Sequence, residues 1–177
     1  MKRVGKLAIM AGAGASLLGA GPAALAAATP KGGKVQVFVT GTSATKSKIT
    51  VTGAIGDYGT TISQDKNGNP DPNGDFQKVT LKHGGFLVDA TALDQRLNKL
   101  RPTINPTNCS VFGSASGPTK VLNGTGAYTG VSGTVRITVT FAGIGPKKAD
   151  GSCNLSNNAP THGAVTVITG TGRVSFH

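Results

Sequence analysis

Side chains that could carry out acid–base or nucleophilic chemistry are few and widely separated in this sequence. The three histidines are His83, His162 and His177, and all seven acidic residues are aspartate. A serine-type nucleophile would need a histidine beside it, and the chain contains no G-x-S-x-G motif. Surface histidines are therefore the favoured interpretation, and the sequence predicts no catalytic residue.

Two aspartates, Asp57 and Asp89, could form a general acid–base pair if folding brought them together. Local roles are favoured for both. Asp57 stands in the turn-like run Gly56–Gly59, and Asp89 precedes a short helical pattern whose start it could cap.

An oxygen-rich segment at 65–75 offers the ligand types that a hard cation such as Ca²⁺ prefers. The EF-hand pattern fails, because the sixth position is Pro70 instead of Gly and the twelfth is Phe76 instead of Glu. A solvated loop of good turn formers is favoured, so neither a metal nor a cofactor is expected. The alternative metal ligands would be Asp65, Asn67, Asp71 and Asp75.

The first 28 residues have the pattern of a secretory signal peptide. A basic start at 2–6 precedes an apolar stretch at 7–25 and small residues around a cleavage site between Ala26 and Ala28. A transmembrane anchor is disfavoured because glycines and Pro22 interrupt the apolar stretch, so no membrane span is expected after cleavage. We expect a secreted protein with a signal peptide at 1–28, a flexible lead-in at 29–33 and one domain at 34–177.

The only cysteines are Cys109 and Cys153, separated by 44 positions. In an exported chain, an even pair indicates one disulfide. Two free thiols or a metal pair are the alternatives, although two cysteines without neighbouring histidines make a poor zinc site.

The chain is strongly basic, with a formal charge of +11 that falls to +8 when Lys2, Arg3 and Lys6 leave with the signal peptide. Such a charge attracts polyanions, including anionic cell-wall polymers, phospholipid headgroups and extracellular nucleic acid. The basic residues are scattered, which favours a simple role in solubility. No basic run alternates with aromatic residues, so specific nucleic-acid binding is not expected.

The composition and the residue pattern predict strands and turns. Glu is absent, while Thr, Val and Gly are abundant. Val135, Ile137 and Val139 alternate with polar residues, as in a half-buried strand. One short helix is expected where Leu93, Leu97 and Leu100 follow a helical spacing, with Thr91 and Asp94 resembling a capping box. Strands are expected at 34–39, 45–53, 54–62, 76–82, 86–89, 109–115, 119–122, 134–141 and 163–176. About eight antiparallel strands with one helix indicate a β-barrel or a β-sandwich.

The run from Gly124 to Gly133 contains several glycines and leads into the strand at 134–141, which predicts a sharp turn. A phosphate-binding loop is excluded, because a strand and not a helix follows Gly126. Tyr128 could line a barrel mouth and contact a ligand. Packing over the glycines of the turn is the favoured role.

The same run resembles the glycine-rich hairpin of the allene oxide cyclase and dirigent barrel families, and the wider pattern is similar to small secreted actinobacterial members. The matching pieces are Asn105–Cys109, Gly124–Gly133, Phe141–Pro146 and Gly151–Asn154. The resemblance implies an all-β, eight-stranded antiparallel barrel with an apolar cavity. Family enzymes cyclise an unstable fatty-acid epoxide or steer the coupling of phenoxy radicals. The buried glutamate of the cyclases has no counterpart, because this chain lacks Glu.

We therefore expect a secreted, non-catalytic barrel that binds a small apolar ligand or an anionic extracellular surface. An enzyme that steers a reactive intermediate in the cavity is the first alternative, and a structural envelope protein without a pocket is the second. An open cavity would favour binding, and a titratable residue inside it would be needed for the enzyme.

Overall fold

The computed structural model describes residues 31–42, 46–154, 156 and 159–177. The predicted signal peptide lies outside the described residues, as do the first two residues of the predicted lead-in. Within the described part of the chain, no helix is long and apolar enough to cross a membrane. The elements are β1 (Gly33–Thr42), β2 (Lys46–Gly53), β3 (Asp57–Gln64), β4 (Phe76–Leu81), β5 (Gly84–Asp89), α1 (Thr91–Asn98), β6 (Thr103–Asn105), β7 (Ser110–Gly126), β8 (Val131–Ile144) and β9 (Gly163–Phe176).

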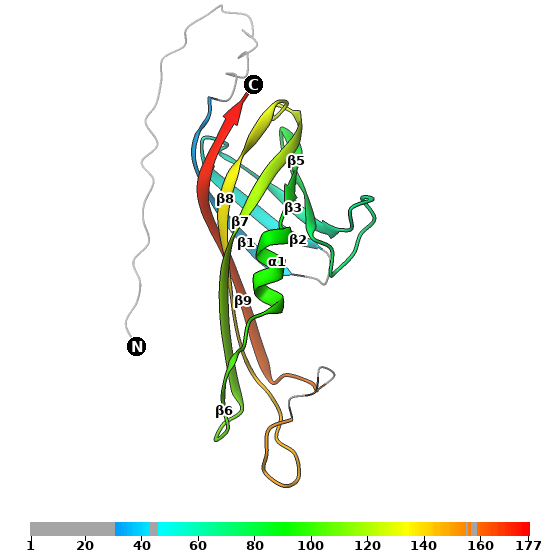
Figure 1. Ribbon diagram of the computed structural model, residues 1–177, viewed down its shortest axis with the longest axis vertical. Helices are drawn as coiled ribbons and strands as arrows, with labels where there is room; N and C mark the ends of the chain where they lie inside the picture. The colour runs from blue at the N-terminus through cyan, green and yellow to red at the C-terminus, as the bar shows by residue number, and fades with distance from the viewer. Residues whose placement is uncertain (1–30, 43–45, 155, 157–158) are drawn as a thin grey trace, which may run out of the picture.

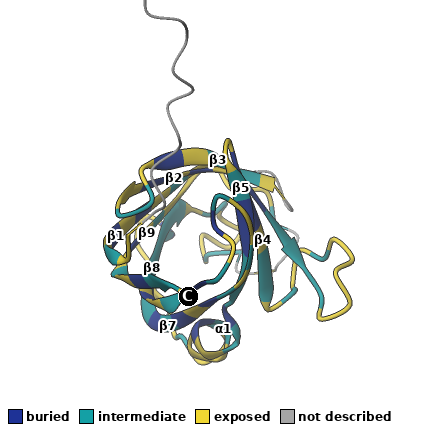
Figure 2. Cartoon of the chain, turned by 90° about the horizontal axis from the view of Figure 1, so that it is seen from above, coloured by how far each residue is buried: buried dark blue, intermediate teal, exposed yellow. Residues whose placement is uncertain are grey.

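Eight of these strands form a closed antiparallel barrel. Their order is β5-β4-β3-β2-β1-β9-β8-β7, and pairing of β5 with β7 closes the ring (Figure 2). Each neighbouring pair is antiparallel. The prediction of an all-β barrel with one short helix is confirmed, and the sandwich alternative is wrong.

Alternation along the strands separates the interior of the barrel from its outer face. On β8, Val135 is buried and Ile137 is half-buried, while Thr134 before Val135 and Arg136 after it are exposed. On β1, Val35 and Val37 are buried. The period of two that the sequence shows is thus the inside–outside alternation of a barrel wall.

Three long strands continue past the barrel. The outer parts of β7, β8 and β9 extend beyond it in Figure 1, and the short β6 pairs with the start of β7. The separate strands expected at 109–115 and 119–122 are wrong, because one strand of 17 residues runs through both. Pro118 fits inside it because β5 pairs with β7 only from Lys120 onward, so no partner on that side requires an N–H. The strand β6 is not among the strands that the residue pattern predicts.

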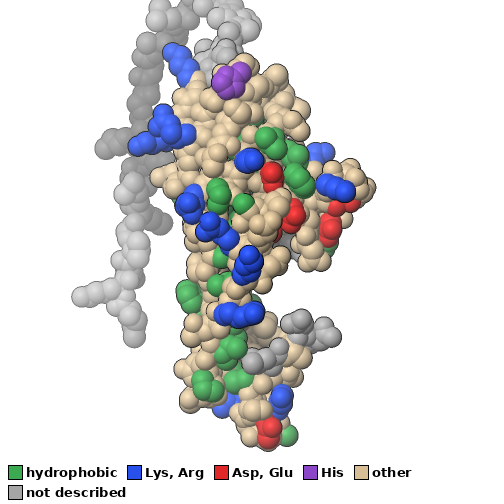
Figure 3. Space-filling view, in the orientation of Figure 1, with side chains coloured by type: hydrophobic (Ala, Val, Ile, Leu, Met, Phe, Trp, Pro, Cys, Tyr) green, Lys and Arg blue, Asp and Glu red, His purple; other side chains and the backbone are tan. Residues whose placement is uncertain are grey.

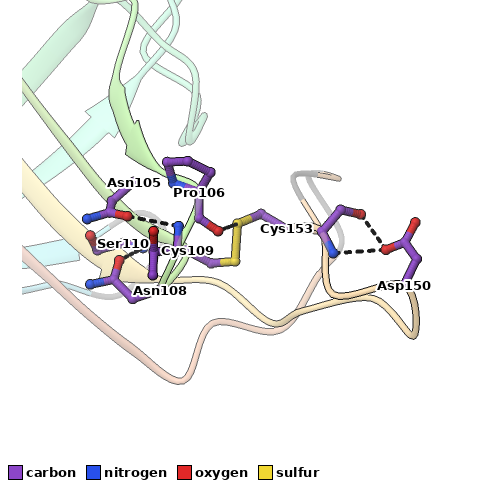
Figure 4. Close-up of a disulfide and its surroundings, with 9 residues drawn as sticks. Asn105, Pro106, Asn108, Cys109, Ser110, Asp150 and Cys153 are labelled. Atoms are coloured by element: carbon purple, nitrogen blue, oxygen red, sulfur yellow. Dashed lines mark hydrogen bonds between the residues drawn. A yellow bond between two sulfur atoms is a disulfide. The ribbon is translucent and has the colours of Figure 1, made fainter.

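The predicted disulfide between Cys109 and Cys153 is confirmed, with a Cα–Cα distance of 5.4 Å. Figure 4 shows it joining the β6–β7 turn to the loop after β8. Cys109 is fully buried, and its carbonyl accepts a hydrogen bond from the N–H of Gly145 at 3.0 Å. The cross-link closes a loop of 44 residues, which in the chain-entropy model stabilises the fold by about 4 kcal/mol at most.

An apolar patch lies on the outer face of this extension. The patch comprises Phe112, Ile144, Val165 and Val167, each between 50% and 57% exposed. Phe112 and Val165 both stand opposite Ala142 of β8, so the patch spans three neighbouring strands.

The helix α1 packs against the inner face of β7 at one end of the barrel. In Figure 1 it lies alongside β7, about halfway along the molecule. Gly117 permits this approach, since a Cβ there would lie 2.8 Å from the Cα of Leu93. The expected capping box is wrong, because Thr91 is the first helical residue and the N-cap residue, Ala90, makes no side-chain cap hydrogen bond. Asp89 instead accepts a hydrogen bond from the N–H of Thr91 at 3.0 Å, consistent with its predicted role at the helix start.

We predict that Gly117→Ala lowers the free energy of unfolding by about 1–3 kcal/mol, because the new methyl group must displace the backbone of α1. Gly163→Ala is the matched control, since nothing lies within 4 Å of the position its Cβ would take. Urea unfolding of both variants measures the difference. Equal stabilities would show that α1 does not need the space above Gly117.

Candidate functional site

The barrel encloses a cavity of about 370 Å³. All eight barrel strands and α1 contribute to its lining, which is mainly aliphatic. The aliphatic lining includes Val35, Val37, Ile49, Val51, Val79, Val121, Val135, Ile137 and Ile168. These side chains face inward because of the strand alternation. Most are valines, and such short side chains leave the centre of the barrel unfilled.

Polar side chains line the cavity at the end where α1 lies, here called the helix end. Ser47 at the start of β2 pairs with Thr61 of β3, and Ser63 at the end of β3 pairs with Gln77 at the start of β4. Gln77 in turn pairs with Val88, just before the chain enters α1. The hydroxyl of Thr61 donates to Oε1 of Gln77 at 3.3 Å. The cavity therefore has an apolar body and one polar end.

Asp94 of α1 is the charged residue of this lining. The residue is half-buried, but its Oδ2 is fully buried and has no hydrogen-bond partner. Burial, together with the nearby carboxylates of Asp75 and Asp89, raises the pKa of Asp94 to about 6. An unpartnered carboxyl at the end of an apolar cavity is a group that can receive a ligand.

The opposite end of the barrel, here called the Tyr128 end, is held by a buried carboxylate. Asp57 begins β3 and is 5% exposed. Its Oδ2 accepts a hydrogen bond from the hydroxyl group of Tyr128 at 2.6 Å and another from the backbone N–H of His83 at 3.0 Å. Nδ1 of His83 lies 3.1 Å from the same oxygen, and the N–H of Tyr58 donates to Oδ1 at 2.7 Å. One carboxylate thus joins the start of β3 to the β4–β5 and β7–β8 turns.

The hydrogen bonds keep this carboxylate ionised despite its burial. Burial alone would raise the pKa of Asp57, but hydrogen bonds from Tyr128, Tyr58 and His83 together lower it to about 2. The pKa of Tyr128 is raised in turn by its burial and by its bond to the ionised Asp57. The ring of Tyr128 also meets Phe86 edge to face, with centroids 6.0 Å apart.

The glycine-rich hairpin delivers Tyr128 to this position. Gly126 and Gly130 take positive φ values of 61° and 75°, which side chains rarely adopt. The turn 127–130 between them folds Tyr128 inward, leaving it 2% exposed. The side chain of Tyr128 packs against Phe86, and Tyr128 is not among the residues that line the cavity. The predicted hairpin between two barrel strands is confirmed.

The other residues that the sequence singled out lie apart from the cavity lining. Asp57 and Asp89 have separate partners and do not bond to each other. His83 is 60% exposed at its side chain although it contacts Asp57. His162 and His177 are both exposed. The sequence suggested only a local turn for Asp57, but Asp57 also accepts hydrogen bonds from His83 and Tyr128.

The oxygen-rich loop between β3 and β4 uses its side chains for its own turns. Oδ1 of Asp65 accepts the N–H groups of Asn67 and Asn69 at 2.8 and 2.9 Å. Asp71 accepts the N–H of Asn73 at 2.9 Å. Within the described ranges, no three His, Cys, Asp or Glu side chains form a group that could hold a metal ion.

Sequence reasoning missed Asp94 as a site residue. Its position three residues after Thr91 matched a capping motif, so its place in a binding site was not considered. The available signal was its place between Leu93 and Leu97 on the helix face that meets the barrel. A charged residue within an apolar helix face is the pattern that would have found it.

No protein-family model, curated protein or solved structure matches the chain. The site is therefore defined by its geometry and chemistry alone.

We predict that Asp57→Asn destabilises the protein by about 2 kcal/mol at pH 7, because the buried charge–hydrogen-bond network is lost. The pKa of Asp57 is lowered from 3.8 to about 2 in the fold, so its contribution is present above pH 4 and is lost as the pH falls toward 2. Urea unfolding of the native protein and the variant at pH 7 and at pH 2.5 measures the free energies of unfolding. The difference in unfolding free energy between the native protein and Asp57→Asn should be smaller at pH 2.5 than at pH 7. An equal difference at both pH values would contradict an electrostatic role.

Proposed function

We propose that this protein binds a small, mainly apolar molecule inside the barrel, with the polar part of that molecule at the helix end. The observation that carries the proposal is the cavity of about 370 Å³, aliphatic along its body and polar at one end. Its volume falls within the roughly 300–1,000 Å³ typical of small-molecule sites. Few polar groups placed at one end of an apolar space are the usual means of orienting a ligand.

A purely structural role is less well supported. A barrel without a ligand would gain dispersion and hydrophobic energy by filling its centre with larger side chains. Here the interior positions of β1 and β8 are Val35, Val37, Val135 and Ile137, and a cavity remains. We infer that the space is kept for an occupant.

We also propose a relationship to the allene oxide cyclase and dirigent barrels, supported by the eight-stranded antiparallel barrel and by the glycine-rich hairpin. An enzyme that steers a reactive intermediate is the alternative use of the same cavity. Asp94 would be its titratable group. Among the described residues that line the cavity, it is the only one that ionises near neutral pH, so acid–base catalysis would lack a second group. Binding is the function that the site supports best.

We propose that the mature protein is exported. The disulfide between Cys109 and Cys153 supports this location, because such bonds persist in oxidising compartments. The signal-peptide pattern at 1–28 is the second support.

A second candidate function is attachment to an anionic extracellular polymer, and a row of basic residues favours it. Lys120 stands opposite Thr134, Thr134 opposite Arg173, and Arg173 opposite Lys34. All four are exposed, and Arg136 lies two residues from Thr134 on the same outer face. Neighbouring strands are about 5 Å apart, so the row presents a compact positive surface. Figure 3 shows Lys and Arg side chains spread along the same side of the molecule as β7 and β8.

The cavity predicts how affinity depends on ligand length. A neutral fluorescent probe, N-phenyl-1-naphthylamine, should bind the protein, and linear alcohols should displace it. Affinity should rise by about fourfold for each added methylene, since burying one CH₂ contributes about 0.8 kcal/mol. The rise should stop when the chain fills the cavity.

Ile137→Phe should abolish or strongly weaken probe binding, because the larger ring occupies the cavity. Thr169→Phe adds a similar ring at an exposed position and is the matched control. Circular dichroism verifies the fold of each variant. Absence of probe binding to the native protein, or equal binding to both variants, would contradict a ligand site inside the barrel.

A further inference from the structure

The charge distribution around the cavity indicates which class of apolar molecule it takes, and this inference rests on the proposed function. Asp94 is the charged residue of the lining, and the described lining residues include no Lys, Arg or His. We propose that the cavity selects aliphatic ligands with a cationic amine head group and discriminates against those with a carboxylate.

The first support is the unpartnered oxygen of Asp94. Its Oδ2 is fully buried at the helix end and accepts no hydrogen bond. A buried acceptor without a donor is costly, and a charged one more so. An ammonium group in the cavity brings three donors and a positive charge to the Asp94 carboxylate, whereas an alcohol brings one neutral donor. A carboxylate brings no donor at all.

The second support is the set of charged groups around Asp94. Asp75, just before β4, and Asp89, at the end of β5, both act on it with negative charge. Lys120 of β7 acts on Asp89. Arg96, on the same helix, directs its guanidinium to the carbonyl of Ser116 at 3.3 Å. The helix end is thus negative, which attracts a cationic head group and repels an anionic one.

The remaining polar groups at the helix end fit the same head group. Ser47, Ser63 and Gln77 line the cavity near the start of β2, the end of β3 and the start of β4. Their hydroxyl and carbonyl oxygens can accept the ammonium protons that Asp94 leaves unbound. The aliphatic body of the cavity then takes the hydrocarbon chain.

Three ligands of equal chain length test the proposal: decylamine, decanol and decanoate. Each competes with N-phenyl-1-naphthylamine at pH 7.5. Decylamine should bind at least about tenfold more tightly than decanol, because its charged hydrogen bonds are stronger. Decanoate should bind more weakly than decanol. Equal affinity for decylamine and decanol would overturn the proposal.

Asp94→Asn should reduce the ratio of decylamine to decanol affinity to about one. Asp150→Asn removes the same charge from an exposed loop and should leave the ratio unchanged. As a measurement that needs no variant, the ratio for the native protein should fall between pH 7.5 and pH 4.5. Asp94 gains its proton over this range while decylamine keeps its charge. A ratio that persists in Asp94→Asn, or that is the same at both pH values, would contradict the assignment to Asp94.

The outcomes separate this inference from the proposed function. If neither the probe nor decanol binds, the proposed function itself fails. If both bind and decylamine shows no preference, the cavity is a ligand site but not one selective for amines.

Discussion

The barrel depends on one buried carboxylate that connects the start of one strand to two turns far apart in the sequence. Asp57 accepts hydrogen bonds from Tyr128 in the β7–β8 turn, from His83 in the β4–β5 turn and from Tyr58, the next residue of β3. The first two turns lie beside the β5–β7 pairing that closes the ring. A barrel with a hollow centre lacks part of the packing that normally holds two walls together. The Tyr128 end adds a polar connection between strands on different sides of the barrel.

Two aspartates have opposite surroundings and different roles in the molecule. Asp57 is surrounded by donors, so it stays ionised and holds the structure together. Asp94 has no donor on its buried oxygen and lies near two other carboxylates, so its pKa is raised. The first carboxylate is satisfied by the fold itself, whereas the second is left to be satisfied by something that enters the cavity. Between them lies an aliphatic interior whose size is set by valines.

Local patterns made the architecture predictable, and long-range contacts made the site unpredictable. The alternation of Val135, Ile137 and Val139 predicted a barrel or sandwich wall, and two cysteines in a chain with a signal-peptide pattern predicted their disulfide. The expected strands at 109–115 and 119–122 are one strand, and Pro118 is tolerated inside it because one side of the strand has no partner there. The partners of Asp57 are up to 71 positions away, and no spacing rule connects them. Asp94 was missed because the same residue type at the same spacing also fits a helix cap.

The central claim is that the interior of the barrel, and not its outer surface, is the ligand site. A crystal structure of the protein with 10-bromodecan-1-ol tests this most directly, because anomalous scattering locates the bromine. We predict a bromine peak inside the barrel among Val37, Ile49 and Val135, with the hydroxyl group toward the helix end. A peak only at the apolar patch of Phe112 and Val165 on the outer face, with an empty interior, would contradict it.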